Sequence, residues 1–450
     1  MTHEMELARH AETVERLIGA RRIDGWEIAL YGARDLAIEV KEGKVDAFRC
    51  AEPFGVAVRL LDGEGLGFSF STTMDPVALE RMVDAALVAA RMQSPDSWYT
   101  LPGPAASYPE LPWLYDPALP ALDEEAKIGR ALELERLVRA YDPRVKRVRK
   151  CAYGESVYHT LVRNSHGLNA ATMGSYNSCS VSAVAEADGD AQTGWDFAFA
   201  PSFAAIDLEK VAAGAGRKAT ALLGARSMPT MRCQVVLDNR VAADLLDVLA
   251  TSFLAESVHK GKSLLAGRVG EGIFSELVSV RDNGLLEGGV GSAPCDGEGV
   301  PQQDTPLVTA GVLQGYLYDS YWAKRLGAAS TGNAQRGAIK SPPRLGANNL
   351  FIEPGTADAG ALIGGVAKGV LITDVMGMHT ANPITGDFSV GASGFYLEGG
   401  ELRHPVKGLA LAGNLLELFR KVDMVGSDLR FFGSTGAPSL RIAELDISGT

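Results

Sequence analysis

The spacing of apolar and polar positions predicts that the first half of the chain mixes helices with an antiparallel sheet. Four segments have the apolar spacing of amphipathic helices, and they span about residues 4–20, 75–92, 124–140 and 207–224. The second is the clearest. Asp75 can cap it, Pro76 suits its first turn, and one face is apolar: Leu79, Met82, Val83, Ala86 and Leu87. Alternating segments with turn residues between them predict strands, and the turns are expected at Glu42-Gly43, Asp62-Gly63, Gly154, His166-Gly167 and Asp188-Gly189.

The second half has a different pattern. A strand is expected at 233–239, followed by an amphipathic helix at 241–257 whose apolar stripe is Val241, Leu245, Leu249 and Phe253. From Gly272 onward, short strand-like segments alternate with Gly-rich turns. Residues 92–120 are rich in Pro and aromatic residues, which predicts an ordered but irregular crossing.

These elements predict an α+β protein of two domains, because 450 residues exceed one ordinary hydrophobic core. We expect an N-terminal mixed domain at 1–225. A larger β-rich domain, an antiparallel sheet or a barrel-like one, is expected at 226–450.

Composition limits the partners and the compartment. The net charge of -12 disfavours direct binding to nucleic acid, and the basic stretch 144–150 alternates with apolar residues like the solvated face of a strand. Five scattered Cys without a C-x-x-C pair fit reduced thiols and a cytoplasmic location. We expect no signal peptide and no membrane association, since no N-terminal apolar core and no apolar run of about 18 residues is present.

Gly261-Lys262-Ser263 matches the end of a phosphate-binding loop, but the rest of that motif is missing. Glu256 stands where the first Gly would be, and its carboxylate would repel phosphate. The segment also follows a predicted helix instead of a strand. A nucleotide site is therefore not expected here.

Other catalytic motifs are also missing. His3 and His10 are two helical turns apart, the remaining His are isolated, and no H-E-x-x-H pair or G-x-S-x-G elbow occurs. The Gly- and acid-rich segment 291–308, which carries Cys295, reads as a polar surface loop. A more promising loop combines polar residues ahead of an alternating strand, as substrate-contacting loops often do: Thr373, Asp374, His379, Asn382 and Thr385.

Long strings of the second half resemble a known family. They are "GVPQQDTPLVTAGVLQGYLYDSYWAKRLGAASTGNAQRG" and "NPITGDFSVGASGFYLEGGELRHPVKGLALAGNLLELFRKVDMVGSDL", after the turn Asp282-Asn283-Gly284. "DLAIEVKEGKVDAF" and "GVAVRLLDGEGLGFSFST" resemble the N-terminal domain of the same family. The chain is thus similar, over nearly its whole length, to the TldD/PmbA family, members of which have been called modulators of DNA gyrase.

The resemblance implies a two-subunit metalloprotease that acts on peptides or unfolded chains. In that family the TldD subunit holds its metal with an H-E-x-x-x-H helix and a later Cys. Here the matching positions are Asp247, Val248 and Thr251, and the string after Met424 contains no Cys. A Val has no acid-base capacity and a Thr rarely binds zinc. The resemblance therefore implies a PmbA/TldE-type subunit with no cofactor of its own, zinc being expected only in a TldD-type partner.

We accordingly expect a heterodimer with a TldD-like paralogue, or a homodimer when the chain is alone. Seven residues are candidates for contact with substrate or partner: His259, Lys260, Lys262, His379, Asn382, Thr385 and Asp387. Two alternatives remain. One is a homo-oligomeric metalloprotease with a non-standard site that uses Asp247, His259 or Cys295, and the other is a non-enzymatic modulator of DNA gyrase.

Overall fold

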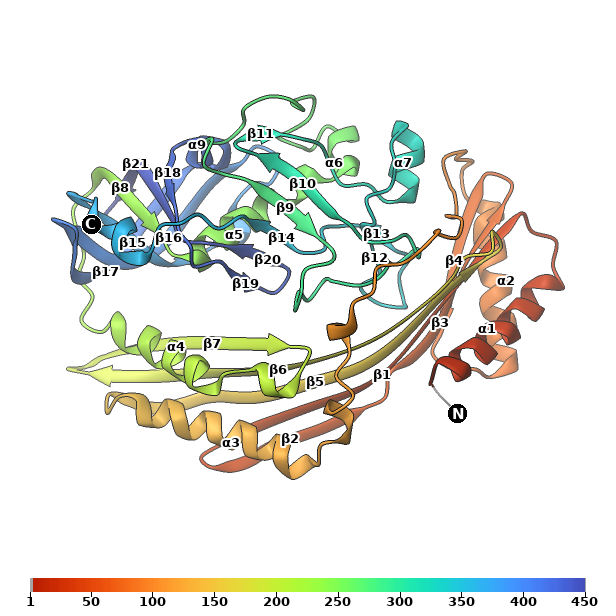
Figure 1. Ribbon diagram of the computed structural model, residues 1–450, viewed down its shortest axis with the longest axis horizontal. Coiled ribbons are helices and arrows are strands. Elements are labelled where there is room, and N and C mark those ends of the chain that lie inside the picture. The colour runs from red at the N-terminus through yellow and green to blue at the C-terminus, as the bar shows by residue number, and fades with distance from the viewer. Residues whose placement is uncertain (1–2, 450) are drawn as a thin grey trace.

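The N-terminal half is built on one long, curved antiparallel sheet (Figure 1). The computed structural model describes residues 3–449 of the chain. Strand order is β4-β3-β1-β5-β6-β7, and β2 pairs with the far part of β1. The strands are β1 (Gly25–Lys41), β2 (Lys44–Ala51), β3 (Phe54–Asp62), β4 (Gly65–Ser71), β5 (Val145–Asn164), β6 (Asn169–Ala187) and β7 (Asp190–Ala200).

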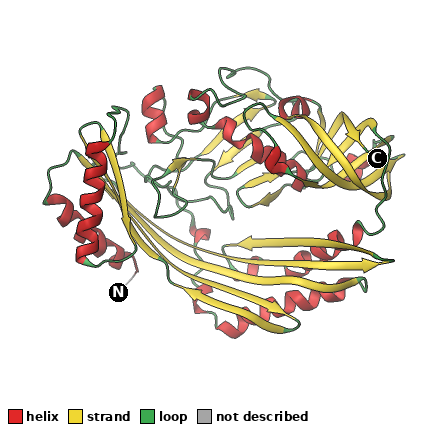
Figure 2. Cartoon of the chain, turned by 180° about the vertical axis from the view of Figure 1, so that it is seen from behind, coloured by secondary structure: helices red, strands yellow, loops and turns green. Residues whose placement is uncertain are grey.

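Two pairs of helices cover the two ends of this sheet, as Figure 2 shows from behind. Their bounds are α1 (His3–Gly19), α2 (Pro76–Met92), α3 (Glu124–Tyr141) and α4 (Leu208–Ala221). The predicted helices are confirmed: Asp75 accepts a hydrogen bond from Ala78 N, and the expected apolar face of α2 is buried. Each helix pair encloses its own hydrophobic cluster.

The predicted turn at Gly154 is wrong. Gly154 lies inside β5, where it pairs with Ala37 of β1 and Ser178 of β6. A Cβ atom at this position would lie 3.2 Å from the Ser178 hydroxyl oxygen. Gly154 therefore permits close packing within a continuous sheet instead of marking a turn. The other predicted turns are confirmed.

Between the two halves of that sheet, residues 93–123 cross without long regular elements, as expected. Only two short 3₁₀ helices occur there, η1 (Pro112–Leu114) and η2 (Leu119–Ala121). The segment is anchored by Leu101, Leu114 and Leu119, which are buried.

The C-terminal half contains two six-stranded sheets around one large hydrophobic cluster. One has the order β11-β10-β9-β14-β20-β19. The other has the order β17-β16-β15-β8-β21-β18 and closes into a barrel-like ring through a β17–β21 pairing. The strands are β8 (Met231–Leu237), β9 (Val280–Asn283), β10 (Asp304–Thr309), β11 (Val312–Leu313), β14 (Leu350–Ile352), β15 (Lys368–Met376), β16 (Asp387–Glu398), β17 (Glu401–Asn414), β18 (Val422–Val425), β19 (Arg430–Phe432), β20 (Thr435–Ala437) and β21 (Leu440–Ser448). The predicted α+β class with a β-rich second half is confirmed.

Helix α5 contacts strands of both C-terminal sheets. The remaining elements are β12 (Ala334–Gln335), β13 (Arg344–Leu345), α5 (Asn239–Ala250), α6 (Ala255–His259), α7 (Ser320–Leu326), α8 (Ala359–Gly364), α9 (Leu415–Arg420) and the 3₁₀ helices η3 (Phe203–Ala205), η4 (Thr251–Phe253) and η5 (Met378–Thr380). The chain passes from α4 to β8 through 222–230, and the boundary predicted at 225/226 falls within that segment. None of the described helices is long and apolar enough to cross a membrane.

The single helix predicted at 241–257 is interrupted. Leu254 is extended, with φ -84° and ψ 128°, and separates η4 from α6. A distant segment competes for the backbone hydrogen bonds that would continue the helix. Leu317 N donates to Phe253 O at 2.8 Å, and Ala255 N donates to Leu317 O at 3.1 Å. Phe253 nevertheless remains fully buried, so the apolar stripe was predicted correctly while its helical continuity was not.

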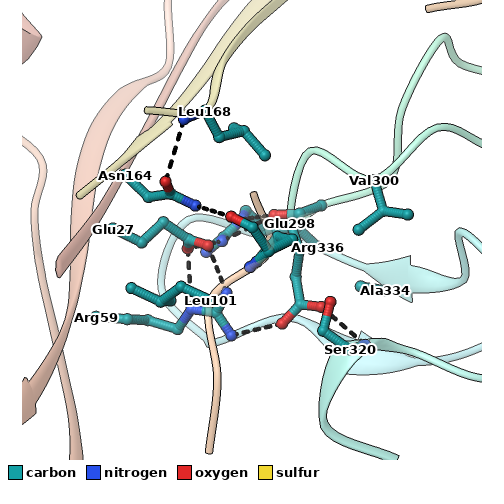
Figure 3. Close-up of polar contacts among 12 residues, drawn as sticks. Glu27, Arg59, Leu101, Asn164, Leu168, Glu298, Val300, Ser320, Ala334 and Arg336 are labelled. Atoms are coloured by element: carbon teal, nitrogen blue, oxygen red, sulfur yellow. Dashed lines mark hydrogen bonds and ion pairs between the residues drawn. The ribbon is translucent and has the colours of Figure 1, made fainter. Parts of the chain in front are cut away.

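A buried ionic cluster links the two halves (Figure 3). The Arg59 guanidinium donates to both oxygens of Glu27 and, at 2.7 Å, to Glu298 Oε1. Arg336 Nη2 donates to Glu27 Oε1 at 2.6 Å. Burial alone would raise the pKa of Glu27, but Arg59 and Arg336 together lower it below its ordinary value.

Segment 291–308 is therefore not the surface loop that its composition predicts. Asp296 is 5% exposed and Glu298 is 3% exposed. The acids are buried because Glu298 meets Arg59 of the other half, and because Asp296 accepts hydrogen bonds from the backbone N–H groups of Glu298, Val300 and Ala334.

Candidate functional site

Helix α5 carries the positions at which the resemblance places a metal site. Asp238 follows β8 and caps the helix by accepting a hydrogen bond from Arg240 N at 3.0 Å. One helix face is buried in the C-terminal core: Val241, Ala242, Leu245, Leu246 and Leu249. The register of this face turns Asp247 and Thr251 toward solvent, while Val248 is half-buried against the core.

Asp247 is hydrogen-bonded to the segment that would carry the third metal ligand, the later Cys of the metal-binding pattern. The Thr435 hydroxyl in β20 donates to Asp247 Oδ1 at 2.9 Å. Thr435 belongs to the Cys-free string after Met424, and β19 and β20 of that string both pack against α5. The two strings that differ from the metal-binding pattern thus lie side by side in the fold.

These residues do not fit a zinc ion. Val248 offers no donor atom, and Asp247 is hydrogen-bonded. Counted from Asp247, the H-E-x-x-x-H spacing puts the second His on Ser252 and not on the predicted Thr251. Both residues offer only a hydroxyl, and Ser252 is fully buried. Across residues 3–449, no three His, Cys, Asp or Glu side chains gather closely enough to hold a metal ion.

The alternative ligand set of Asp247, His259 and Cys295 is also not assembled. His259 packs against Trp322, with ring centroids 5.3 Å apart. Cys295 lies 4.0 Å from the Thr172 hydroxyl, and burial raises its thiol pKa to about 12. These contacts place the three side chains in separate surroundings, so the described residues do not bring them together, and a site that uses one of them stays an untested alternative.

The polar loop at 379–387 uses most of its candidate residues to hold its own shape. Asn382 Oδ1 accepts a hydrogen bond from Ile384 N at 2.9 Å, and Thr385 Oγ1 accepts one from Asp387 N at 3.3 Å. Asn414 donates a hydrogen bond to Asp387 at 3.0 Å. This bond and a side-chain hydrogen bond with Thr385 lower the pKa of Asp387 below its ordinary value. His379 is the exposed candidate whose side chain holds no such bond.

Two other candidates line a cavity of about 860 Å³ between the halves. His259 of α6 and the adjacent Lys260 form part of its wall, whereas Lys262 is exposed outside it. No residue of the 379–387 loop lines this cavity. The structure therefore divides the seven predicted contact residues between at least two places, and their role in contact stays a prediction.

Several lining residues were not candidates in the sequence. They come from both halves: Arg59, Phe68, Tyr99, Tyr321, Trp322 and Arg344. The pairs Trp98-Tyr99 and Tyr321-Trp322 offer a signal in the sequence, as adjacent large aromatics near charged residues. The others are brought to the cavity by contacts between segments far apart in the chain.

Comparison with known proteins agrees with this architecture. Family models match consecutive parts of the chain: PmbA/TldA metallopeptidase domain 1 at 26–90, the central domain at 117–223 and the C-terminal domain at 230–449. The fold is similar to the crystal structure of TldE from Thermococcus kodakarensis, with a TM-score of 0.89, 26% identity and coverage of 97% of this chain and 100% of that one. It is equally similar to a putative modulator of a DNA gyrase from Thermotoga maritima. That match has a TM-score of 0.89 and 26% identity, and it covers 98% of this chain and 100% of that one.

Sequence relatives extend over nearly the whole length. The Metalloprotease PmbA of Escherichia coli O157:H7 is 28% identical over 438 residues, which cover 96% of this chain and 94% of the relative. Haemophilus influenzae contributes both a Metalloprotease PmbA homolog, 26% identical with coverage of 94% and 92%, and a Metalloprotease TldD homolog, 29% identical with coverage of 91% and 89%. The chain belongs to the PmbA/TldD family of metalloprotease-like proteins.

Proposed function

We propose that this chain is the metal-free, PmbA/TldE-type subunit of a two-subunit protease that cleaves peptides or unfolded chains. The supporting observation lies at α5, where Asp247 and Val248 stand at the positions of the first His and the Glu, Ser252 stands at that of the second His, and Thr435 donates a hydrogen bond to Asp247. Zinc, general base and hydrolysis would belong to a TldD-type partner. The occurrence of a PmbA homologue and a TldD homologue in one organism supports a paired assembly.

In this proposal the C-terminal β-rich half contacts the partner, and the two chains enclose a channel. His379 is exposed on the loop beside α5 and is the loop's candidate for contact with substrate or partner. Its neighbours Asn382, Thr385 and Asp387 keep that loop in shape, so they act by positioning.

The test is coexpression of this chain with a cognate TldD-type protein. We expect a complex that cleaves an unfolded peptide and loses activity with a zinc chelator, while the isolated chain neither cleaves nor holds more than about 0.1 zinc per molecule. The matched control is the partner bearing a substitution in its own ligand helix. Chelator-sensitive cleavage by this chain alone, or about one zinc per isolated chain, would refute the proposal.

A further inference from the structure

The 860 Å³ cavity between the halves is lined by one apolar wall and several charged groups. Its volume lies within the range of about 300–1,000 Å³ that is usual for ligand pockets. Strands β3 and β4 and the loop after α2 supply one side, while α6, α7 and residues 342–345 supply the other. Because Asp247 and Thr251 do not line it, the cavity is distinct from the open face of α5.

The apolar wall is a connected aromatic shelf. The rings of Tyr99 and Tyr321 lie 5.5 Å apart, and Tyr321 meets Trp322 edge-on at 5.0 Å. Phe68, Leu66 and two prolines extend the wall. A shelf of this kind favours a flat or apolar group, and the aromatic rings would contribute most of the contact area.

The acidic groups in the cavity are already satisfied. Glu298 accepts hydrogen bonds from Arg59 and from Ser320 N, and Asp319 accepts one from Trp322 N at 2.8 Å. Glu256 pairs with Lys260. Two of the three carboxylates are thus paired with cations of the protein, and Asp319 caps α7.

The open donors of the cavity are one cation and two neutral or titratable groups. Arg344 is exposed, and the structure gives its guanidinium no ion pair and no side-chain hydrogen bond within residues 3–449. His259 makes a ring contact with Trp322 but likewise no hydrogen bond. The Gln93 side-chain oxygen accepts from Leu66 N, which leaves its amide N–H₂ available.

This arrangement suits one negative charge beside an apolar group. A phosphate dianion would meet only one permanently charged, unpaired cation and would lie near three carboxylates, which would repel it. A carboxylate carries a single charge and matches the planar guanidinium in a two-point hydrogen bond. The C-terminus of a peptide with an apolar last residue combines both features.

We propose that this cavity binds the C-terminal end of a peptide, with its carboxylate on Arg344 and His259 and its last side chain on the Tyr321-Trp322 shelf. The inference rests on the proposed function as a peptide-handling subunit, and it specifies which end of the peptide this subunit holds. Arg344 and His259 would set specificity for a free carboxylate, while cleavage would take place in the partner.

The experiment measures binding by the isolated chain, so it does not depend on assembly or proteolysis. The probe is a fluorescein-labelled peptide, Gly-Ser-Gly-Ala-Leu-Phe, with either a free or an amidated C-terminus, followed by fluorescence anisotropy. We expect amidation to weaken binding about tenfold, since a hydrogen-bonded charge is lost. Arg344→Gln should weaken binding of the free acid to the same extent and leave binding of the amide unchanged.

The matched control is Arg420→Gln, which removes an exposed arginine of α9 outside the cavity and should leave both affinities unchanged. Three results would each overturn the inference: equal binding of acid and amide, an unchanged affinity in Arg344→Gln, or no saturable binding up to about 1 mM. Displacement of the peptide by inorganic phosphate at lower concentration than by acetate would overturn it in favour of a phosphate site. A chain that binds the free acid as expected but forms no active complex with a TldD-type protein would refute the proposed function and leave this inference standing.

Discussion

Replacement of Arg59 by Met should destabilise the protein strongly. Arg59 is 5% exposed and bridges Glu27, at 1%, and Glu298, at 3%. Burial disfavours the Arg59 cation, but the two carboxylates outweigh this and raise its pKa above its ordinary value. The Met side chain retains most of the apolar stem but leaves Glu298 with only Ser320 N as a donor, and Glu27 with only Arg336.

The expected loss is about 3–5 kcal/mol of unfolding free energy, the usual cost of leaving a buried charge without its partner. A surface pair provides the matched control. Arg136 and Glu133 form an ion pair at 2.7 Å with side chains 64% and 44% exposed, so Arg136→Met should change the stability far less than Arg59→Met does.

The pH dependence supplies a second readout. In the wild-type protein Glu27 has a lowered pKa, so its contribution to stability is present above its unfolded pKa of about 4.5 and is lost as the pH falls through the folded value. In Arg59→Met the buried carboxylates can relieve the penalty by taking up protons. The stability gap between the two proteins should therefore narrow as the pH is lowered from about 8 to about 5.

The assay is equilibrium urea unfolding, followed by tryptophan fluorescence and circular dichroism at each pH. Adding Glu298→Gln to Arg59→Met should recover part of the loss, because it removes one uncompensated charge. The reasoning would be refuted by an Arg59→Met variant that is no less stable than Arg136→Met, or by a gap that does not change with pH.

Three further predictions use the same unfolding assay. Burial raises the pKa of Asp319 to about 6, above its unfolded value, so the contribution of Asp319 to stability should fall as the pH rises from about 4 through about 6. Asp319→Asn keeps a capping oxygen and should be more stable than wild type by about 1–3 kcal/mol at pH 7.5 but not at pH 4, and a pH-independent difference would contradict this. Leu245→Ala in the buried face of α5 should cost about 2–5 kcal/mol and the half-buried Val248→Ala clearly less, so equal losses would argue against this packing. Gly67→Ala would place a Cβ atom 1.7 Å from a backbone oxygen of α2 and should cost about 1–3 kcal/mol of unfolding free energy. The control is Gly103→Ala, whose Cβ atom would meet nothing within 4 Å and which should not change the stability. A Gly67→Ala variant as stable as wild type would disprove the close approach of β4 to α2.

Local chemistry was sufficient to predict many elements. The cap at Asp75 and the apolar spacing of α2 depend only on neighbours within a few residues, so they could be identified from the sequence. The turn at Glu42-Gly43 closes a tight hairpin with φ angles of 54° at Glu42 and 72° at Gly43, and glycine adopts such an angle without strain. The mismatch at Val248 could equally be identified from the sequence, because a side chain without a donor atom cannot bind metal in any fold.

Long-range contacts decided the rest. Leu317 ends the helix that the apolar stripe predicts, because its backbone hydrogen bonds compete with helical ones at Phe253 and Ala255. Arg59, 239 residues away, makes it possible to bury Glu298 in a segment whose composition indicates a surface loop.

For the candidate sites, the sequence by itself determined which chemical groups are present and which are missing. Only the tertiary structure decided which groups lie next to one another. In it Thr435 donates a hydrogen bond to Asp247, His259 lies apart from the 379–387 loop, and Arg344 lines the same cavity as the aromatic shelf. The physical reason is that a side chain's type is local, whereas its burial, partners and free donors depend on segments that meet only when both halves have folded and packed together.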